Sequence, residues 1–64
     1  MFIVVNKRKL RESQSFDHAD SVAAHLLGRR LADYVVIKSN SEGDRTVPLT
    51  TPYAHEIQQQ LEQA

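Results

Sequence analysis

The sequence of 64 residues contains no cysteine and no tryptophan. Without cysteine, the chain has neither a disulfide framework nor a thiolate metal site. A chain of this length folds around one core, so we expect a single domain over residues 1–64. Domains below about 70 to 80 residues seldom gain more than a few kcal/mol from their core without a disulfide, a metal or a partner. We therefore expect self-association.

Long apolar runs are also absent. The longest run spans about five residues, far fewer than the about 20 that a membrane-spanning helix needs. At the start of the chain the apolar run precedes the basic residues, which is the reverse of the order in a secretory signal peptide. These features predict a soluble, cytoplasmic protein with no membrane partner.

Eight basic and eight acidic side chains leave no net charge, which removes the general attraction to nucleic acid or anionic lipid of a strongly basic domain. The charges are divided unevenly along the chain. Residues 1–31 carry six basic and three acidic side chains, whereas residues 32–64 carry two basic and five acidic ones. This polarity is suited to steering a partner or another copy of the same chain.

Two runs of β-branched and aromatic residues, 2–6 and 34–38, predict short strands that are apolar on both faces. Such strands belong in the centre of a sheet, with neighbouring elements covering both of its sides. They are the strongest strand signals in the sequence.

Weaker patterns predict two outer strands. The segment 10–14 is expected to return beside the first strand with only Leu10 pointing inward. The segment 45–49 follows a loop rich in serine, asparagine and glycine. Pro48 cannot donate a hydrogen bond within a sheet, so this strand lies at an edge or ends there.

The first helix is predicted over 17–28. Asp17 is expected to cap its N-terminus, with Asp20 three residues later, and Gly28 suits the position after its C-terminus. Its apolar stripe comprises Ala19, Val22, Ala23 and Leu26.

The second helix is predicted over 52–62. Thr51 is expected to be its cap, and Pro52 its first residue. Its narrow apolar stripe contains Tyr53, Ile57 and Leu61, so the helix has a thin contact with the core.

These elements predict an α+β fold, a small sheet of three to four strands with two helices in the order β(β)αββα. If 10–14 forms a strand, the strands 2–6 and 34–38 are antiparallel neighbours; if it does not, they are parallel. Two short helices are few for covering both faces of such a sheet. This is a second reason to expect self-association, as a homodimer.

The sequence carries no signature of catalysis. His18 and His25 are seven residues apart on the first predicted helix, about 10 Å of rise, which is too far for one zinc ion. Helix capping explains Asp17 and Asp20 without catalysis. With two glycines in the chain, no nucleophile-elbow, Walker-type or dinucleotide motif is present. We expect no enzyme activity, no catalytic residue, no metal and no cofactor.

One local charge cluster is a candidate contact surface for nucleic acid or a partner. Basic residues in a turn can follow a phosphate backbone, although no exposed aromatic residue is interleaved with them for base stacking. The alternative explanation is a solvated turn that keeps a strand edge from aggregating. The candidate contacts are Lys7, Arg8, Lys9 and Arg11, extended by Arg29 and Arg30.

The leading functional hypothesis is a non-catalytic interaction or regulatory module that binds a protein partner, or itself as a homodimer, through an exposed sheet face or edge. The alternative is a nucleic-acid-binding module that uses the basic hairpin. Small charge-balanced chains of this kind are frequent among bacterial and bacteriophage accessory proteins, and that association identifies no partner.

Overall fold

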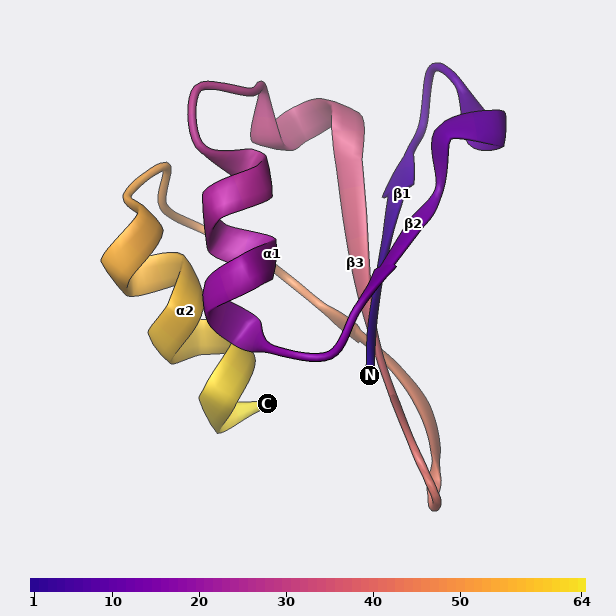
Figure 1. Ribbon diagram of the computed structural model, residues 1–64. Helices are drawn as coiled ribbons and strands as arrows, with labels where there is room; N and C mark the ends of the chain where they lie inside the picture. Colours follow the sequence, from indigo (N-terminus) through magenta and orange to yellow (C-terminus); the bar gives the residue numbers. More distant parts are fainter.

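The computed structural model describes residues 1–64 and has the expected α+β architecture, a four-stranded antiparallel sheet packed against two helices (Figure 1). The sheet has the strand order β2-β1-β3-β4. Two single-turn 3₁₀ helices, η1 and η2, precede β2 and β3. The elements along the chain are β1 (Phe2–Asn6), η1 (Leu10–Glu12), β2 (Gln14–Phe16), α1 (Ala19–Leu26), η2 (Leu31–Asp33), β3 (Tyr34–Asn40), β4 (Gly43–Val47) and α2 (Ala54–Gln63).

The two strands with the strongest apolar signal, β1 and β3, form the centre of the sheet, as predicted. They are antiparallel, and Ile3 lies opposite Ile37 while Val4 lies opposite Val36. The return strand β2 exists and reverses the chain before α1, which is the condition under which the sequence predicts this antiparallel pairing. The weaker strands β2 and β4 are the two edges.

The return strand is displaced from the predicted segment 10–14. It covers Gln14–Phe16, and Leu10–Glu12 form a turn of 3₁₀ helix instead. Leu10 was expected to point inward, but 69% of it is exposed. Phe16 is the residue that anchors this strand, since it lies opposite Phe2 and packs against the core.

This displacement also moves the start of α1. Because β2 continues to Phe16, Asp17 lies in the turn, and the helix begins at Ala19 with His18 as its N-cap residue. The prediction that Asp17 caps the helix is therefore wrong. The expected role of Gly28 is confirmed: it follows the C-cap residue Leu27 and has a φ of 78°, a conformation that glycine adopts without strain.

The hairpin between β3 and β4 is tighter than predicted. Its strands extend to Asn40 and begin again at Gly43, whose φ of 126° only glycine adopts readily. The side chain of Asn40 accepts a hydrogen bond from the amide of Glu42 at 2.9 Å, which stabilises the turn. As expected for an edge strand, β4 ends before Pro48.

The start of α2 also differs from the prediction. The helix begins at Ala54 with Tyr53 as its N-cap residue, two residues later than the predicted Thr51 cap and Pro52 start. The hydroxyl of Thr51 still accepts a hydrogen bond from the Tyr53 amide at 3.3 Å, and donates to Glu56 at 2.6 Å. Tyr53 itself is 69% exposed and does not belong to the apolar stripe.

The core is a single cluster of ten buried residues between the helices and one face of the sheet. The strands contribute Phe2, Val4, Val36 and Val47, and the helices contribute Ala19, Val22, Ala23, Leu26, Ile57 and Leu61. Complete burial of a residue such as Leu26 or Ile57 contributes about 1.5 to 3 kcal/mol.

Both helices pack on the same side of the sheet, so the expectation of strands covered on both sides is wrong (Figure 1). The opposite face of β1 and β3 is left without a covering layer from this chain.

Candidate functional site

The predicted basic residues begin in the loop between β1 and β2, which is held by its own hydrogen bonds. The side chain of Asn6 accepts from the amide of Arg8 at 3.0 Å, and its carbonyl accepts from the amide of Lys9 at 3.1 Å. The amide of Lys7 donates to the carbonyl of Asp33 at 2.7 Å, which ties the loop to the start of β3. The loop therefore has a defined conformation while its basic side chains point to solvent.

The loop residues Lys7 to Glu12 surround an open hollow of ≈ 530 Å³. Only Leu10 is apolar among them. One loop cation is paired: Arg8 lies 3.4 Å from the carboxylate of Asp33, in an ion pair whose arginine side chain is 71% exposed. Lys7, Lys9 and Arg11 have no acidic partner within ion-pair distance.

The structure brings the remaining predicted contacts to the same end of the molecule. Arg29 and Arg30 follow α1, which ends beside the start of β3, and β3 starts opposite the end of β1. Arg11 and Arg29 line one common pocket. All six predicted contacts, Lys7, Arg8, Lys9, Arg11, Arg29 and Arg30, are exposed.

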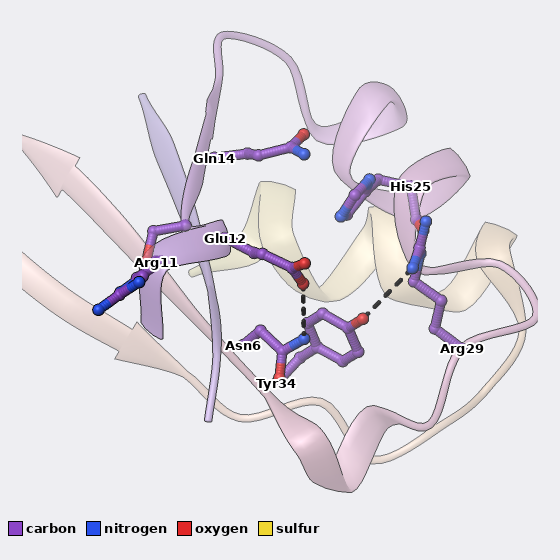
Figure 2. Close-up of a pocket in the computed structure, with 8 residues that line it drawn as sticks. Asn6, Arg11, Glu12, Gln14, His25, Arg29 and Tyr34 are labelled. Atoms are coloured by element: carbon purple, nitrogen blue, oxygen red, sulfur yellow. Dashed lines mark hydrogen bonds between the residues drawn. The ribbon is translucent and has the colours of Figure 1, made fainter. Parts of the chain in front are cut away.

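That pocket, of ≈ 400 Å³, lies between the basic loop and the end of α1 (Figure 2). Its polar groups pair largely with one another. Arg29 donates from Nε to the carbonyl of His25 at 2.8 Å and from Nη1 to the hydroxyl of Tyr34 at 3.4 Å. On the other side, the side-chain amide of Asn6 donates from Nδ2 to the carboxylate of Glu12 at 3.4 Å. Arg11 extends away from the other labelled side chains (Figure 2).

His25 forms the half-buried wall of the pocket. Its ring lies 5.2 Å from the ring of Phe16 and 6.4 Å from the ring of Tyr34, edge-on to the latter. Burial, together with the nearby charge of Arg29, lowers the pKa of His25 below its usual 6.5. This favours the neutral form of the ring, which suits its contacts with two aromatic rings.

The pocket combines the guanidinium groups of Arg11 and Arg29 with the carboxylate of Glu12, and has no paired nucleophile and base. The hydroxyl of Ser13 donates to the carbonyl of Leu10 at 2.9 Å instead of to His25. Nucleophilic catalysis needs a hydroxyl or thiol within hydrogen-bond reach of a base. The hydrogen bond from Arg29 to Tyr34 instead joins the segment after α1 to β3.

Sequence reasoning did not identify the open face of the sheet residue by residue. Alternation along the strands puts Ile3 and Val5 of β1 on that face, in register with Ile37 and Val35 of β3. All four side chains are half-buried by their neighbours in the sheet. The signal that locates them is the period of two within each apolar run, combined with both helices packing on the other side.

Polar residues flank this aliphatic block on the two edge strands. Ser15 lies opposite Ile3 on β2, and Thr46 lies opposite Ile37 on β4. Two residues before Thr46 in β4, Asp44 shares the same face and lies opposite Ser39. The open face is thus an apolar centre with a polar rim, the composition of protein interaction surfaces.

No group of three or more histidine, cysteine or acidic side chains is arranged to hold a metal ion. Neither helix has the length and apolar character needed to cross a membrane. Comparisons with protein-family models, with curated proteins and with solved structures find no match to this chain.

Proposed function

We propose that this chain is a non-catalytic interaction module that binds a protein partner through the open face of its sheet. The observation that carries the proposal is the block of Ile3, Val5, Val35 and Ile37, which no helix of the chain covers. Contiguous apolar side chains on the surface of a small protein favour association.

The face suits a partner better than either edge of the sheet. An edge binds by adding a strand, which needs a row of free backbone groups. The edge strand β2 has three residues, and β4 ends before Pro48 and carries Asp44 and Arg45. Short length, proline and charge are the features by which sheet edges resist strand addition.

The proposal extends to the setting of the protein. We place it in the cytoplasm, as a regulatory or accessory protein of a bacterium or a bacteriophage. Fractionation of native host cells followed by immunodetection tests this part of the proposal independently of binding.

The interface is tested with a paired substitution on the open face, Ile3→Thr with Ile37→Thr. Threonine keeps the β-branched shape that favours strands and removes apolar surface. A partner copurified from the host, identified and then purified separately, is titrated with both proteins by calorimetry. We expect the double variant to bind at least about tenfold more weakly, since one lost apolar contact on each strand costs about 1 kcal/mol or more.

The matched control is Leu27→Thr, which changes an apolar residue that is 64% exposed at the end of α1. We expect this variant to bind like the wild type. Unchanged affinity of the Ile3→Thr, Ile37→Thr variant, with its fold verified by circular dichroism, contradicts the proposal.

A second candidate function is binding to the backbone of a nucleic acid. It is favoured by one observation: the basic loop and the arginines after α1 lie at one end of the molecule, with Arg11 and Arg29 on a common pocket. Contacts with phosphates give affinity that falls steeply with salt and varies little with base sequence.

This candidate is tested by replacing Lys7, Arg8, Lys9 and Arg11 with glutamine. With about four phosphate contacts, the slope of log affinity against log salt is expected near −3 to −4 on duplex DNA, and the variant is expected to lose binding. A wild-type protein that binds neither DNA nor RNA at about 50 mM salt rules the candidate out.

A further inference from the structure

We infer that the open face is covered by a second copy of this chain, packed face to face about a twofold axis. In this arrangement β1 of one copy runs in the opposite direction to β1 of the other. The inference rests on the proposed function and names the occupant of that same face. It follows from the way in which the fold distributes charge along the strands.

Six of the eight basic side chains gather at one end of the sheet. β1 ends there and leads into the loop with Lys7, Lys9 and Arg11, and β3 begins there after Arg29 and Arg30. In this cluster the ion pair of Arg8 with Asp33 neutralises one cation. In Figure 1 this end lies at the top of the sheet.

The opposite end of the sheet has a net negative charge, because four acidic side chains there outnumber Lys38 and Arg45. The turn of the β3–β4 hairpin carries Glu42 and Asp44, at the bottom of the sheet in Figure 1. Asp17 and Asp20 lie at the same end, because β2 finishes opposite Phe2, where β1 begins. Charge is thus separated along the strand direction, although Asp17 and Asp20 come from the basic half of the sequence.

Two copies can stack these faces about a twofold axis in two ways. If the axis runs along the strands, the basic end of one copy lies over the basic end of the other. If it runs across the strands within the sheet plane, each basic end lies over the partner's acidic end, and the favourable contact occurs twice. Like charges disfavour the first arrangement and opposite charges favour the second.

The chemistry of the face also suits a second copy. Its centre consists of the β-branched side chains Ile3, Val5, Val35 and Ile37, and two such surfaces pack at about 10 Å between sheets, as in β-sandwiches. The result is a four-layer arrangement, with a helix layer outside each sheet. The contact between the sheets buries apolar area in addition to that of the core, which is how association stabilises a domain of this size.

The first measurement is sedimentation of the wild-type chain at about 100 µM protein and about 50 mM salt, where charges are weakly screened. We expect a closed dimer with twice the 7.3 kDa mass of one chain. A monomer under these conditions overturns the inference, and so does a mass that continues to rise with concentration, because head-to-tail contacts produce open chains.

Charge reversal tests the orientation. Lys7→Glu with Lys9→Glu reverses two cations of the basic end, and Glu42→Lys with Asp44→Lys reverses the acidic turn. We expect each pair alone to weaken the dimer at least about tenfold and the four substitutions together to restore it, since opposite charges then face each other again. Glu56→Lys with Glu62→Lys, on α2, is the control with a matched charge change and no expected effect.

All four reversed positions lie in exposed turns or on an exposed edge strand, so the variants are expected to fold. A dimer that neither pair weakens overturns the inference. Raising the salt to about 1 M shortens the screening length to about 3 Å, and should weaken the wild-type dimer and remove the difference between it and the charge variants.

The same experiments separate this inference from the proposed function. If the wild type is a monomer and the Ile3→Thr, Ile37→Thr variant no longer binds the purified partner, the second copy is refuted and the proposed function is retained. A dimer that this double variant leaves intact refutes the second copy on this face, since self-association then uses another surface, and the partner titration alone decides the proposed function.

Discussion

The two faces of the central strands carry side chains of the same type and differ in what covers them. On one face, Val4 of β1 and Val36 of β3 lie opposite each other, and each is 1% exposed under the helices. On the other face, Ile3 lies opposite Ile37, and Val5 opposite Val35, without a covering layer. Burial is thus decided by where the helices pack, because both faces have the same strand propensity.

This difference separates the energetics of folding from those of binding. Side chains on the covered face contribute to the free energy of unfolding of one chain. Side chains on the open face have apolar area left for a partner, since their neighbours in the sheet bury only part of it.

The largest effect is expected for the covered side of the molecule. Leu26→Ala removes a side chain of α1 that is 1% exposed, and should lower the free energy of unfolding by about 2 to 4 kcal/mol through lost burial and a cavity. Thermal or denaturant unfolding followed by circular dichroism measures it. A midpoint equal to that of the wild type would show that α1 is not part of the core.

The comparison between the faces is sharpest for adjacent valines of β3. Val36→Ala should cost about 2 kcal/mol, whereas Val35→Ala, on the open face, should cost less than about 1 kcal/mol in the monomer. Denaturant unfolding at a protein concentration too low for association isolates the monomer. Equal losses at the two positions would mean that the open face is also covered within one chain.

A smaller effect is expected from pH at the pocket beside the covered face. Because the pKa of His25 is lowered on folding, the unfolded chain binds its proton more readily. Stability from this group is therefore fully present above the unfolded pKa of about 6.5, and is lost as the pH falls towards the folded pKa. His25→Gln should reduce the slope of stability against pH below 6.5; an unchanged slope would assign it to other groups.

The smallest effect is expected in the basic loop. Arg8→Gln breaks the ion pair with Asp33, yet should change the free energy of unfolding by less than about 0.5 kcal/mol, because the arginine is 71% exposed. The same unfolding assay measures it, with Lys9→Gln as a control that breaks no ion pair. A loss above 1 kcal/mol would show that the pair supports the connection of β1 to β3, counter to the usual weakness of surface pairs.

The central part of the fold is predictable because its signals are local and redundant. Apolar runs mark the strands β1 and β3. The glycine after α1 marks the end of that helix, and the proline after β4 marks the end of that strand. Given the return strand, chain reversal requires β1 and β3 to be antiparallel, as observed. No separate knowledge of the tertiary structure is needed for these features.

The errors arise where a tertiary contact overrides a local signal. Leu10 resembles the inward residue of a strand, but the contact between Phe16 and Phe2 sets the register and leaves Leu10 in an exposed turn. That register also takes Asp17 out of its predicted capping position. At α2, Tyr53 has the spacing of an apolar stripe but becomes the N-cap residue, which directs it to solvent.

The candidate binding surface could be predicted only in part. The basic residues are contiguous in sequence, so their clustering in one loop is visible without a structure. The four aliphatic residues of the open face have the same period as the core residues between them. Which of the two sets is covered depends on the side of the sheet on which the helices pack. That side is determined by the chirality and lengths of the connections rather than by any single residue.

The register between β1 and β3 has a consequence for biosynthesis. Ile3 pairs with Ile37, so β1 has its central neighbour only after β2, α1 and η2 have been translated. At about 5 to 20 residues per second, that interval is roughly 2 to 7 s. During it, β1 can pair only with the three residues of β2. Until β3 is available, β1 is therefore an apolar strand without its central neighbour.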